Sequence, residues 1–134
     1  ALYGASMAGV KVDLIVRGIC CLKPGMPIVS ENIRVVSVVG RFLEHSRVYY
    51  FLNNPNQVYC SSADWMERNL SHRIEVCFPI LKKKWATRIV AEMEMYLEDQ
   101  AQSWEMQADG EYIERFDLDN QTVAVQTLLL KQLS

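Results

Sequence analysis

The sequence predicts an α/β fold, in which helices flank a β-sheet, from three observations. Residues Val10–Val16 are mostly apolar and β-branched, which is typical of a strand covered on both faces of such a sheet. Further along, Trp85, Ile89 and Met93 recur at the spacing of one face of an α-helix. The chain has 134 residues and is 50% hydrophobic, enough for one core. We therefore expect a single domain over residues 1–134.

The first third of the chain predicts the end of a helix, a strand and a long loop. Residues Ala1–Gly9 are typical of the last turns of a helix stopped by glycine, and they suggest the C-terminal piece of a longer protein. The strand Val10–Val16 ends at Arg17, where the carboxyl edge of an open α/β sheet binds ligands. Arg17 is therefore a candidate phosphate contact, and an arginine that simply extends to solvent is the alternative. The segment Ile19–Asn32 lacks periodicity and predicts a loop.

The middle of the chain predicts a second strand and a hairpin. Ile33–Val39 is another apolar, β-branched run, and Gly40 after it frees the backbone to turn. Two further strands, Arg47–Leu52 and Gln57–Ser61, flank the turn-forming residues Asn53–Asn56. This spacing is typical of a β-hairpin.

A short helix and another strand are expected next. Asp64 and Glu67 have the spacing of a capping box, so we expect a helix over Trp65–Leu70. Capping alone explains Asp64 and the serines before it, and contact with a ligand is the alternative. In Arg73–Ile80 charged and apolar residues alternate, as in a strand with one exposed face. His72, just before this strand, is expected at the surface.

The last third predicts a long helix, a hairpin and a final helix. Residues Lys82–Gln100 form an amphipathic helix, and its first lysines are either a solvated face or a phosphate contact. The hairpin Ser103–Phe116, which turns at Ala108–Gly110, is expected at a sheet edge. Asn120 would cap the final helix. That helix would dock through its apolar residues Val123, Val125, Leu128, Leu129, Leu130 and Leu133.

Composition limits the classes of function. The formal charge of −2 argues against general nucleic-acid binding, which needs a basic surface. No signal peptide is visible, and no apolar run approaches the roughly 18 residues that a membrane span needs. The cysteines lie in apolar runs without C-x-x-C spacing, so we expect reduced core residues of a cytosolic protein, with disulfides as the alternative. They are Cys20, Cys21, Cys60 and Cys77.

One stretch has the residue types of a site for anionic oxygens. His45 lies between Arg41 and Arg47, so a group that exchanges protons near pH 7 is flanked by two forked donors that match phosphate. A helix start follows, where Ser62 and Asn69 are further candidate phosphate contacts. Polar residues also gather at ordinary strand ends, which is the alternative.

No metal site is readable from the sequence. The strongest carboxylate candidates are Glu31, Glu44 and Asp64. Each has a capping or surface explanation of equal weight, and Mg²⁺ prefers several oxygen ligands together.

Four ordered blocks of sequence resemble the C-terminal catalytic domain of bacterial polyphosphate kinase. The blocks are Val10–Leu22, Ser30–Val35, Val39–Arg47 and Ser61–Met66. The resemblance covers Val10–Ile80 well, and from Leu81 onward it extends only to the order of the elements. It implies a phospholipase D-like mixed β-sheet flanked by helices.

The resemblance also implies a function. Polyphosphate kinases reversibly transfer the terminal phosphate of ATP to inorganic polyphosphate through a phosphohistidine, which belongs to the domain before this one. Arg17 corresponds to an ATP-contacting arginine, and His45 to a second active-site histidine that contacts ATP and assists transfer as an acid or base. Mg²⁺ would enter with ATP, bound mainly outside this chain. Because the phosphohistidine lies outside it, the isolated chain is expected to be inactive.

The resemblance further implies partners and a location. The partners are ATP or ADP, inorganic polyphosphate, the preceding domain of the same chain and further copies of it, with no nucleic acid. The location is the cytoplasm or the periphery of the inner membrane.

Two alternative functions remain open. A phospholipase D-like phosphodiesterase needs two histidine motifs per site, which a homodimer that pairs two His45 residues would supply. However, Arg47 and Leu52 replace the lysine and aspartate of that pattern, so hydrolysis is not expected. A non-catalytic oligomerisation domain is suggested by the apolar last helix, and loss of self-association on deletion of Gln121–Ser134 would support it.

Overall fold

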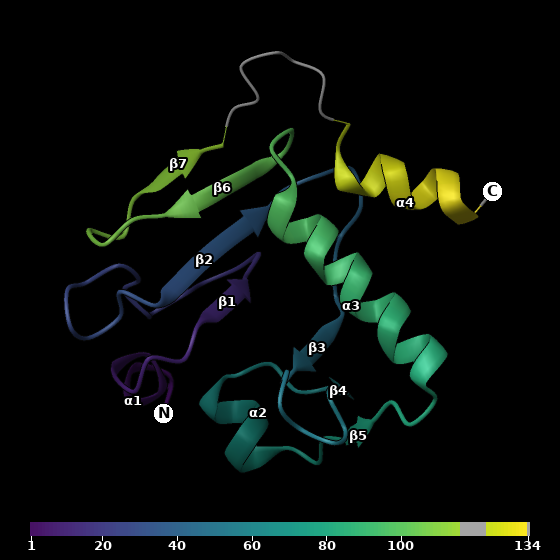
Figure 1. The fold of residues 1–134 in the computed structure, drawn as a ribbon, viewed down its shortest axis with the longest axis horizontal. Helices are drawn as coiled ribbons and strands as arrows, with labels where there is room; N and C mark the ends of the chain where they lie inside the picture. The colour runs from purple at the N-terminus through teal and green to yellow at the C-terminus, as the bar shows by residue number, and fades with distance from the viewer. Residues whose placement is uncertain (116–122, 134) are drawn as a thin grey trace. The chain divides into compact units, whose positions relative to one another are not determined.

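The computed structural model contains two separate β-sheets, and it describes residues 1–115 and 123–133. The sheets belong to two compact units (Figure 1). Unit 1 comprises residues 1–42 and 95–134, and unit 2 comprises residues 43–94. The single domain expected over residues 1–134 stays a prediction.

Unit 1 is built on a mixed four-stranded sheet in the order β1-β2-β6-β7. Its strands are β1 (Val12–Ile15), β2 (Ile33–Val38), β6 (Ser103–Met106) and β7 (Tyr112–Glu114). β1 and β2 are parallel, and the other neighbours are antiparallel. The α/β class and a mixed sheet with flanking helices are therefore confirmed. The predicted closing hairpin is also confirmed and places β7 at the edge, while Phe116 lies outside the described residues.

The central strand β2 is buried on both faces. Ile33 and Val35 pack on the side of Met106 and of α1 (Leu2–Met7). Val36 and Val38 pack on the other side, against Val125. Successive residues of a strand point to opposite faces, so one strand supplies both parts of the unit's core.

The strand β1 lies at the sheet edge, and this corrects one prediction. We expected Val10–Val16 to be covered on both faces, but its residues alternate between half-buried and exposed, and Val10 and Ile15 are exposed. An apolar run does not say whether a strand is central or at an edge. Here the neighbours of β1 are β2 on one side and none of the described strands on the other.

The loop before β2 is held by buried hydroxyl groups. The helix α1 ends at Met7, and the predicted stop residue Gly9 follows its C-cap Ala8. The φ of +83° at Gly9 allows a Schellman motif in which Val10 N–H donates to the Ala5 carbonyl at 3.0 Å. The predicted loop Ile19–Asn32 is confirmed. Within it, the fully buried Ser30 accepts a hydrogen bond from Met26 N–H at 3.1 Å and donates to the Lys23 carbonyl at 2.6 Å.

Asp99 joins the end of α3 (Lys83–Glu98) to the start of α4 (Val125–Leu133). Its carboxylate accepts hydrogen bonds from Ala101 and Gln102 N–H, both at 2.8 Å, and from Val125 N–H at 2.7 Å. A carboxylate is favourable at a helix N-terminus. Both predicted helices are confirmed, and α4 docks through Val125 and Leu129. Docking through the other expected residues is wrong, because the structure leaves them exposed: Val123, Leu128, Leu130 and Leu133. Asn120, which we expected to cap α4, lies outside the described residues.

Unit 2 is built on an antiparallel sheet in the order β3-β4-β5. Its elements are β3 (Arg47–Tyr50), β4 (Val58–Ser61), α2 (Glu67–His72) and β5 (Cys77–Pro79). The predicted hairpin is therefore confirmed. The capping box is not: α2 begins at Glu67 after the N-cap Met66, which makes no side-chain cap, because Asp64 is engaged elsewhere.

Two further predictions need correction, one for a strand of unit 2 and one for the cysteines of both units. Only Cys77–Pro79 pairs within the expected strand Arg73–Ile80, and Ile74 is exposed rather than on a buried face. All four cysteines are free thiols, as expected, but Cys21 and Cys77 are exposed because they lie in a loop and on an edge strand. None of the described helices is long and apolar enough to cross a membrane.

We predict that Asp99→Ala destabilises the chain. Asp99 is 5% exposed, and removal of its side chain leaves three backbone N–H groups without their acceptor. The expected loss is about 3 kcal/mol of unfolding free energy, measured by urea denaturation. Asp109→Ala is the matched control, because Asp109 also accepts a backbone N–H but lies in an exposed turn. Equal losses in both variants would contradict this account of Asp99.

Candidate functional site

The candidate catalytic residue His45 begins the polar part of unit 2. It lies two residues before β3, and its side chain is exposed. Its backbone carbonyl accepts a hydrogen bond from Nη1 of Arg47 at 3.1 Å. An exposed imidazole can meet a ligand and exchange protons with it near pH 7. His72 is exposed as predicted.

Arg47 is largely committed to Asp64. Its Nε and Nη2 donate to the same oxygen, Oδ1 of Asp64, at 2.9 and 2.8 Å. The Arg47 side chain is only 19% exposed. Hydrogen bonds from the Arg47 guanidinium lower the pKa of the Asp64 carboxyl, helped by the nearby positive charges. The Asp64 carboxyl is therefore ionised near neutral pH.

The segment that carries Asp64 is held against one face of β3. Arg47 and Tyr49 are two residues apart and share that face. The Tyr49 ring stacks on Trp65, with ring centroids 5.4 Å apart, and the Tyr49 hydroxyl donates to the Ala63 carbonyl at 3.4 Å. These contacts and the ion pair hold residues 63–65 to the strand.

Ser62 and Asn69 meet at Glu75. The Ser62 hydroxyl donates to one carboxylate oxygen of Glu75 and accepts Val76 N–H at 3.0 Å. Asn69 Nδ2 donates to the other oxygen of Glu75 at 2.8 Å. Hydrogen bonds from Ser62 and then Asn69 lower the pKa of Glu75. The donors proposed from the sequence as phosphate contacts thus face a carboxylate in this structure.

Sequence reasoning missed Glu75 as a site residue. The alternation in Arg73–Ile80 assigned it to a solvent-facing side of a strand. Its partners Ser62 and Asn69 precede it by 13 and 6 residues, and no spacing rule for strands or helices connects them. A carboxylate that follows a hydroxyl-rich helix start was the available signal, and it is a weak one.

A pocket of about 350 Å³ lies beside this cluster. It combines aromatic rings with polar groups, and its lining residues are Tyr49, Ser61, Ala63, Trp65, Asn69, Leu70, Arg73, Glu75, Val76 and Cys77. Asn69 is 3% exposed, and its Oδ1 has no hydrogen-bond partner among the described residues. The pocket wall therefore includes both the carboxylate of Glu75 and one exposed arginine, Arg73.

The other two predicted arginines, Arg17 and Arg41, belong to unit 1. Arg17 is exposed in the bend after β1, and Arg41 lies over the ring of Phe42 at 5.4 Å. The Phe42 backbone is held by Gln126 of α4 through two hydrogen bonds of 2.8 Å. Both guanidinium groups are therefore presented to solvent, where anions can reach them.

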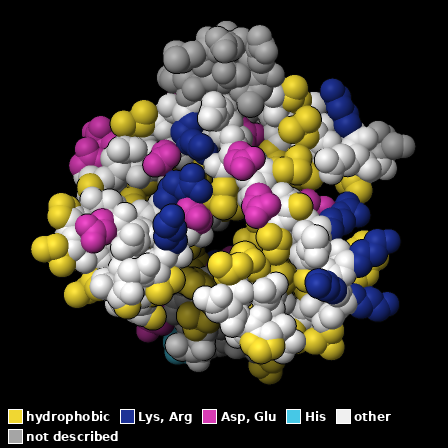
Figure 2. Space-filling view, viewed as in Figure 1, with side chains coloured by type: hydrophobic (Ala, Val, Ile, Leu, Met, Phe, Trp, Pro, Cys, Tyr) yellow, Lys and Arg dark blue, Asp and Glu magenta, His cyan; other side chains and the backbone are white. Residues whose placement is uncertain are grey.

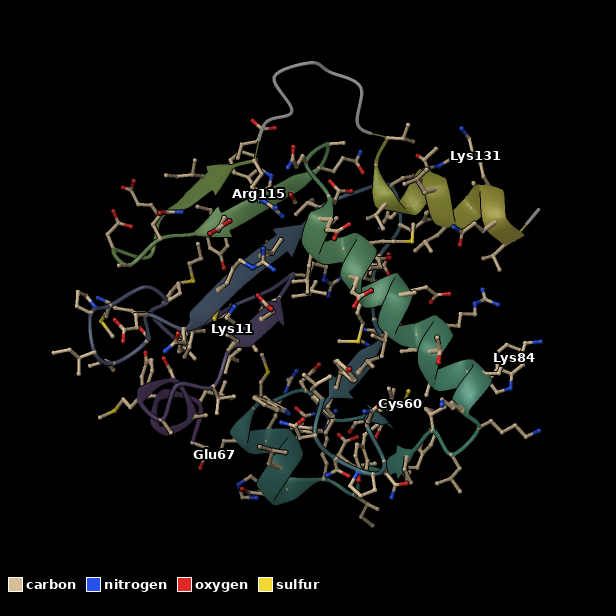
Figure 3. All side chains as sticks on the ribbon, viewed as in Figure 1. Lys11, Cys60, Glu67, Lys84, Arg115 and Lys131 are labelled. Carbon is tan, nitrogen blue, oxygen red and sulfur yellow. The ribbon has the colours of Figure 1, made fainter. Side chains whose placement is uncertain are left out.

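The lysines at the start of α3 form a solvated face. Lys82–Lys84 are exposed, and Figure 2 shows Lys and Arg side chains gathered over this first turn. Lys84, labelled in Figure 3, extends away from the helix, with its Nζ 5.5 Å from the centre of the Trp85 ring. Figure 3 also labels Arg115, which donates to the Leu97 carbonyl at 2.7 Å and so has a structural contact.

Carboxylates that could hold a metal do not gather in the part of the chain that the structure describes. No group of three or more His, Cys, Asp or Glu side chains there has the arrangement of a metal site. Asp64 is paired with Arg47. The described groups can instead exchange a proton through His45 and attract anions through exposed arginines.

Comparisons with known proteins match this chain to polyphosphate kinases over most or all of its length. A family model described as polyphosphate kinase C-terminal domain 2 matches residues 1–126. A polyphosphate kinase of Pseudomonas putida is 55% identical over 136 aligned positions, which cover 100% of this chain and 19% of that protein. One of Burkholderia multivorans is 59% identical over 117 positions, covering 86% of this chain and 17% of that protein.

A solved structure is similar as well. The crystal structure of polyphosphate kinase from Porphyromonas gingivalis matches with a TM-score of 0.91 and 43% identity. The match covers 98% of this chain and 20% of that one. The chain thus spans about a fifth of the length of the curated relatives it matches.

We predict that Asp64 and Glu75 titrate at lower pH than ordinary carboxyl groups. Because their folded-state pKa values are lowered, their contribution to stability is present above the unfolded pKa and is lost as the pH falls through the folded pKa. Carbon-13 NMR of the carboxyl carbons measures both titrations. Ser62→Ala should raise the pKa of Glu75 and leave Asp64 unchanged, whereas Arg47→Ala should raise the pKa of Asp64. Ordinary titration of both groups in the unsubstituted chain would contradict the described contacts.

Proposed function

Since the chain belongs to the polyphosphate kinase C-terminal domain 2 family, we propose that it is one part of an enzyme that reversibly transfers the terminal phosphate of ATP to inorganic polyphosphate. The observation that carries this proposal is a match that extends over the whole chain to proteins named polyphosphate kinase. The chain corresponds to about a fifth of their length. The rest of the active site, including the phosphohistidine, would then lie in a preceding domain of the same chain.

In this proposal Arg17 and His45 contact ATP. The transferred phosphoryl group spreads negative charge over its oxygens, and a guanidinium such as that of Arg17 stabilises that charge. His45 would donate or accept the proton, or a hydrogen bond, opposite the phosphohistidine. Support comes from the exposure of both side chains, which leaves them open to substrate.

The remaining candidate phosphate contacts differ in whether their donor groups are free to bind phosphate. Arg41 is exposed and would assist Arg17 in attracting phosphate. Phosphate contact by Arg47, Ser62 and Asn69 stays a prediction. In this structure the described donors of these residues already face carboxylates or a backbone carbonyl. A phosphate would have to displace those acceptors.

Mg²⁺ would accompany ATP and neutralise phosphate charge. Three or more grouped acidic or histidine ligands do not occur among residues 1–115 and 123–133. We therefore place the metal ligands in the domains outside this chain and assign no step of the reaction to a metal held here.

The two alternative functions, a phosphodiesterase and an oligomerisation domain, have less support than phosphate transfer. The phosphodiesterase pattern needs a lysine that is free to bind phosphate, whereas Arg47 at that position is paired with Asp64. Self-association has one favourable observation: the side chains Leu128, Leu130 and Leu133 of α4 are exposed, and such apolar residues suit an interface. Assembly into homo-oligomers and the cytoplasmic location stay predictions.

We predict that Arg17→Ala and His45→Ala each lower the rate of ATP formation from ADP and polyphosphate in the full-length enzyme. The expected loss is about 10²-fold or more, as for removal of a charge-stabilising donor or an acid-base group. Phosphorus NMR measures ATP formation. Asp109→Ala, in an exposed turn, should keep full activity. Full activity in His45→Ala would overturn the role of His45, and turnover by the isolated 134-residue chain would overturn the division of the active site.

A further inference from the structure

The Arg47 guanidinium donates hydrogen bonds to both Asp64 and the His45 backbone. Arg47 uses the side-on fork of its guanidinium, Nε and Nη2, for one oxygen of Asp64, and it uses Nη1 for the His45 carbonyl. That fork is the side of the guanidinium that binds a carboxylate or phosphate most completely. While the ion pair exists, this side of Arg47 cannot bind a phosphate group.

His45 lies in a stretch without regular secondary structure. Residues 43–46 form neither helix nor strand, and β3 begins at Arg47. No ladder of backbone hydrogen bonds therefore sets the position of His45. The hydrogen bond from Arg47 Nη1 connects the His45 carbonyl to a residue that β3 does hold, since Arg47 is opposite Ser61 in the sheet register.

Asp64 is itself a fixed partner. Tyr49 holds the residues on either side of it, through the Ala63 carbonyl and the Trp65 ring. The negative charge of Asp64 is compensated by Arg47, and Arg68 contributes further positive charge nearby. The contacts thus form a continuous path from the face of β3, through Asp64 and Arg47, to His45.

We propose that Arg47 and Asp64 are positioning residues that hold His45 in place for phosphoryl transfer and do not themselves bind phosphate. This inference rests on the proposed function and deepens it. A group that exchanges a proton must lie within hydrogen-bond reach of its target, and a displacement of about 1 Å can cost about 10²-fold in rate. Without Asp64 the Arg47 side chain loses two of its hydrogen bonds and is free to rotate away from the His45 carbonyl.

The test uses steady-state kinetics of the full-length enzyme with ATP and polyphosphate. Arg47→Ala and Asp64→Ala should each lower kcat by roughly 10- to 100-fold, while the KM for ATP changes less than about threefold. The double variant should be no slower than the slower single variant. Asp64→Asn keeps an oxygen that accepts from Arg47, so it should recover most of the rate lost in Asp64→Ala.

Two comparisons separate positioning from a general structural role. On the residual rate of His45→Ala, adding Arg47→Ala or Asp64→Ala should cause no further loss, because both act through His45. The matched control is Asp13→Ala, which removes a similar ion pair with Arg34, 2.7 Å long, from unit 1. It should leave kcat within about twofold of the unsubstituted enzyme. Circular dichroism melts confirm that each variant is folded.

Several results would overturn the proposal. A raised KM in Arg47→Ala with normal kinetics in Asp64→Ala would make Arg47 a phosphate ligand. If Arg47→Ala or Asp64→Ala lowered the rate further on the His45→Ala background, the Arg47–Asp64 pair would have only a structural role. The same conclusion would follow if Asp64→Asn did not recover the rate lost in Asp64→Ala. Normal kinetics in both single variants, together with a slow His45→Ala variant, would reject positioning and keep the proposed function. An inactive unsubstituted enzyme, or a fully active His45→Ala variant, would reject the proposed function itself.

Discussion

Burial of β2 on both faces is the constraint on which unit 1 depends. Val35 and Val36 are neighbours in sequence, point to opposite faces and are both fully buried. Each face then needs a cover: α1 and Met106 on one side, α4 and the end of α3 on the other. Asp99 makes the second cover possible, since it satisfies the first backbone N–H of α4. Arg17 and Arg41 are displayed from the segments around this core.

Unit 2 depends more on polar contacts than on an apolar core. Val58 and Ala63 are its buried apolar residues. Asp64 and Glu75 provide much of the remaining order, since each carboxylate joins segments that lie apart in the sequence. Such contacts give a more specific geometry than apolar packing, because hydrogen bonds depend on direction as well as distance. A residue such as His45, which lies outside any helix or strand, benefits from that geometry.

In the proposed function, the same arrangement would let an arginine-rich motif serve a reaction without each arginine binding substrate. Arg17 and Arg41 are exposed cations, whereas Arg47 is a partly buried donor with an internal partner. The difference is one of surroundings and not of residue type. If His45 exchanges a proton during phosphate transfer, as we propose, then cations that attract charge and contacts that maintain geometry are separate requirements.

The sequence by itself determined the α/β class, the order of the elements, the hairpin at Asn53–Asn56 and the family, because these depend on local patterns and on ordered motifs. It also pointed to Arg17 and His45. Only the tertiary structure decided that β1 is an edge strand and that Asp64 pairs with Arg47 and does not cap α2. It also decided that Glu75 accepts hydrogen bonds from Ser62 and Asn69. The physical reason is that these outcomes depend on which distant segments become neighbours, and residue spacing along the chain does not contain that information.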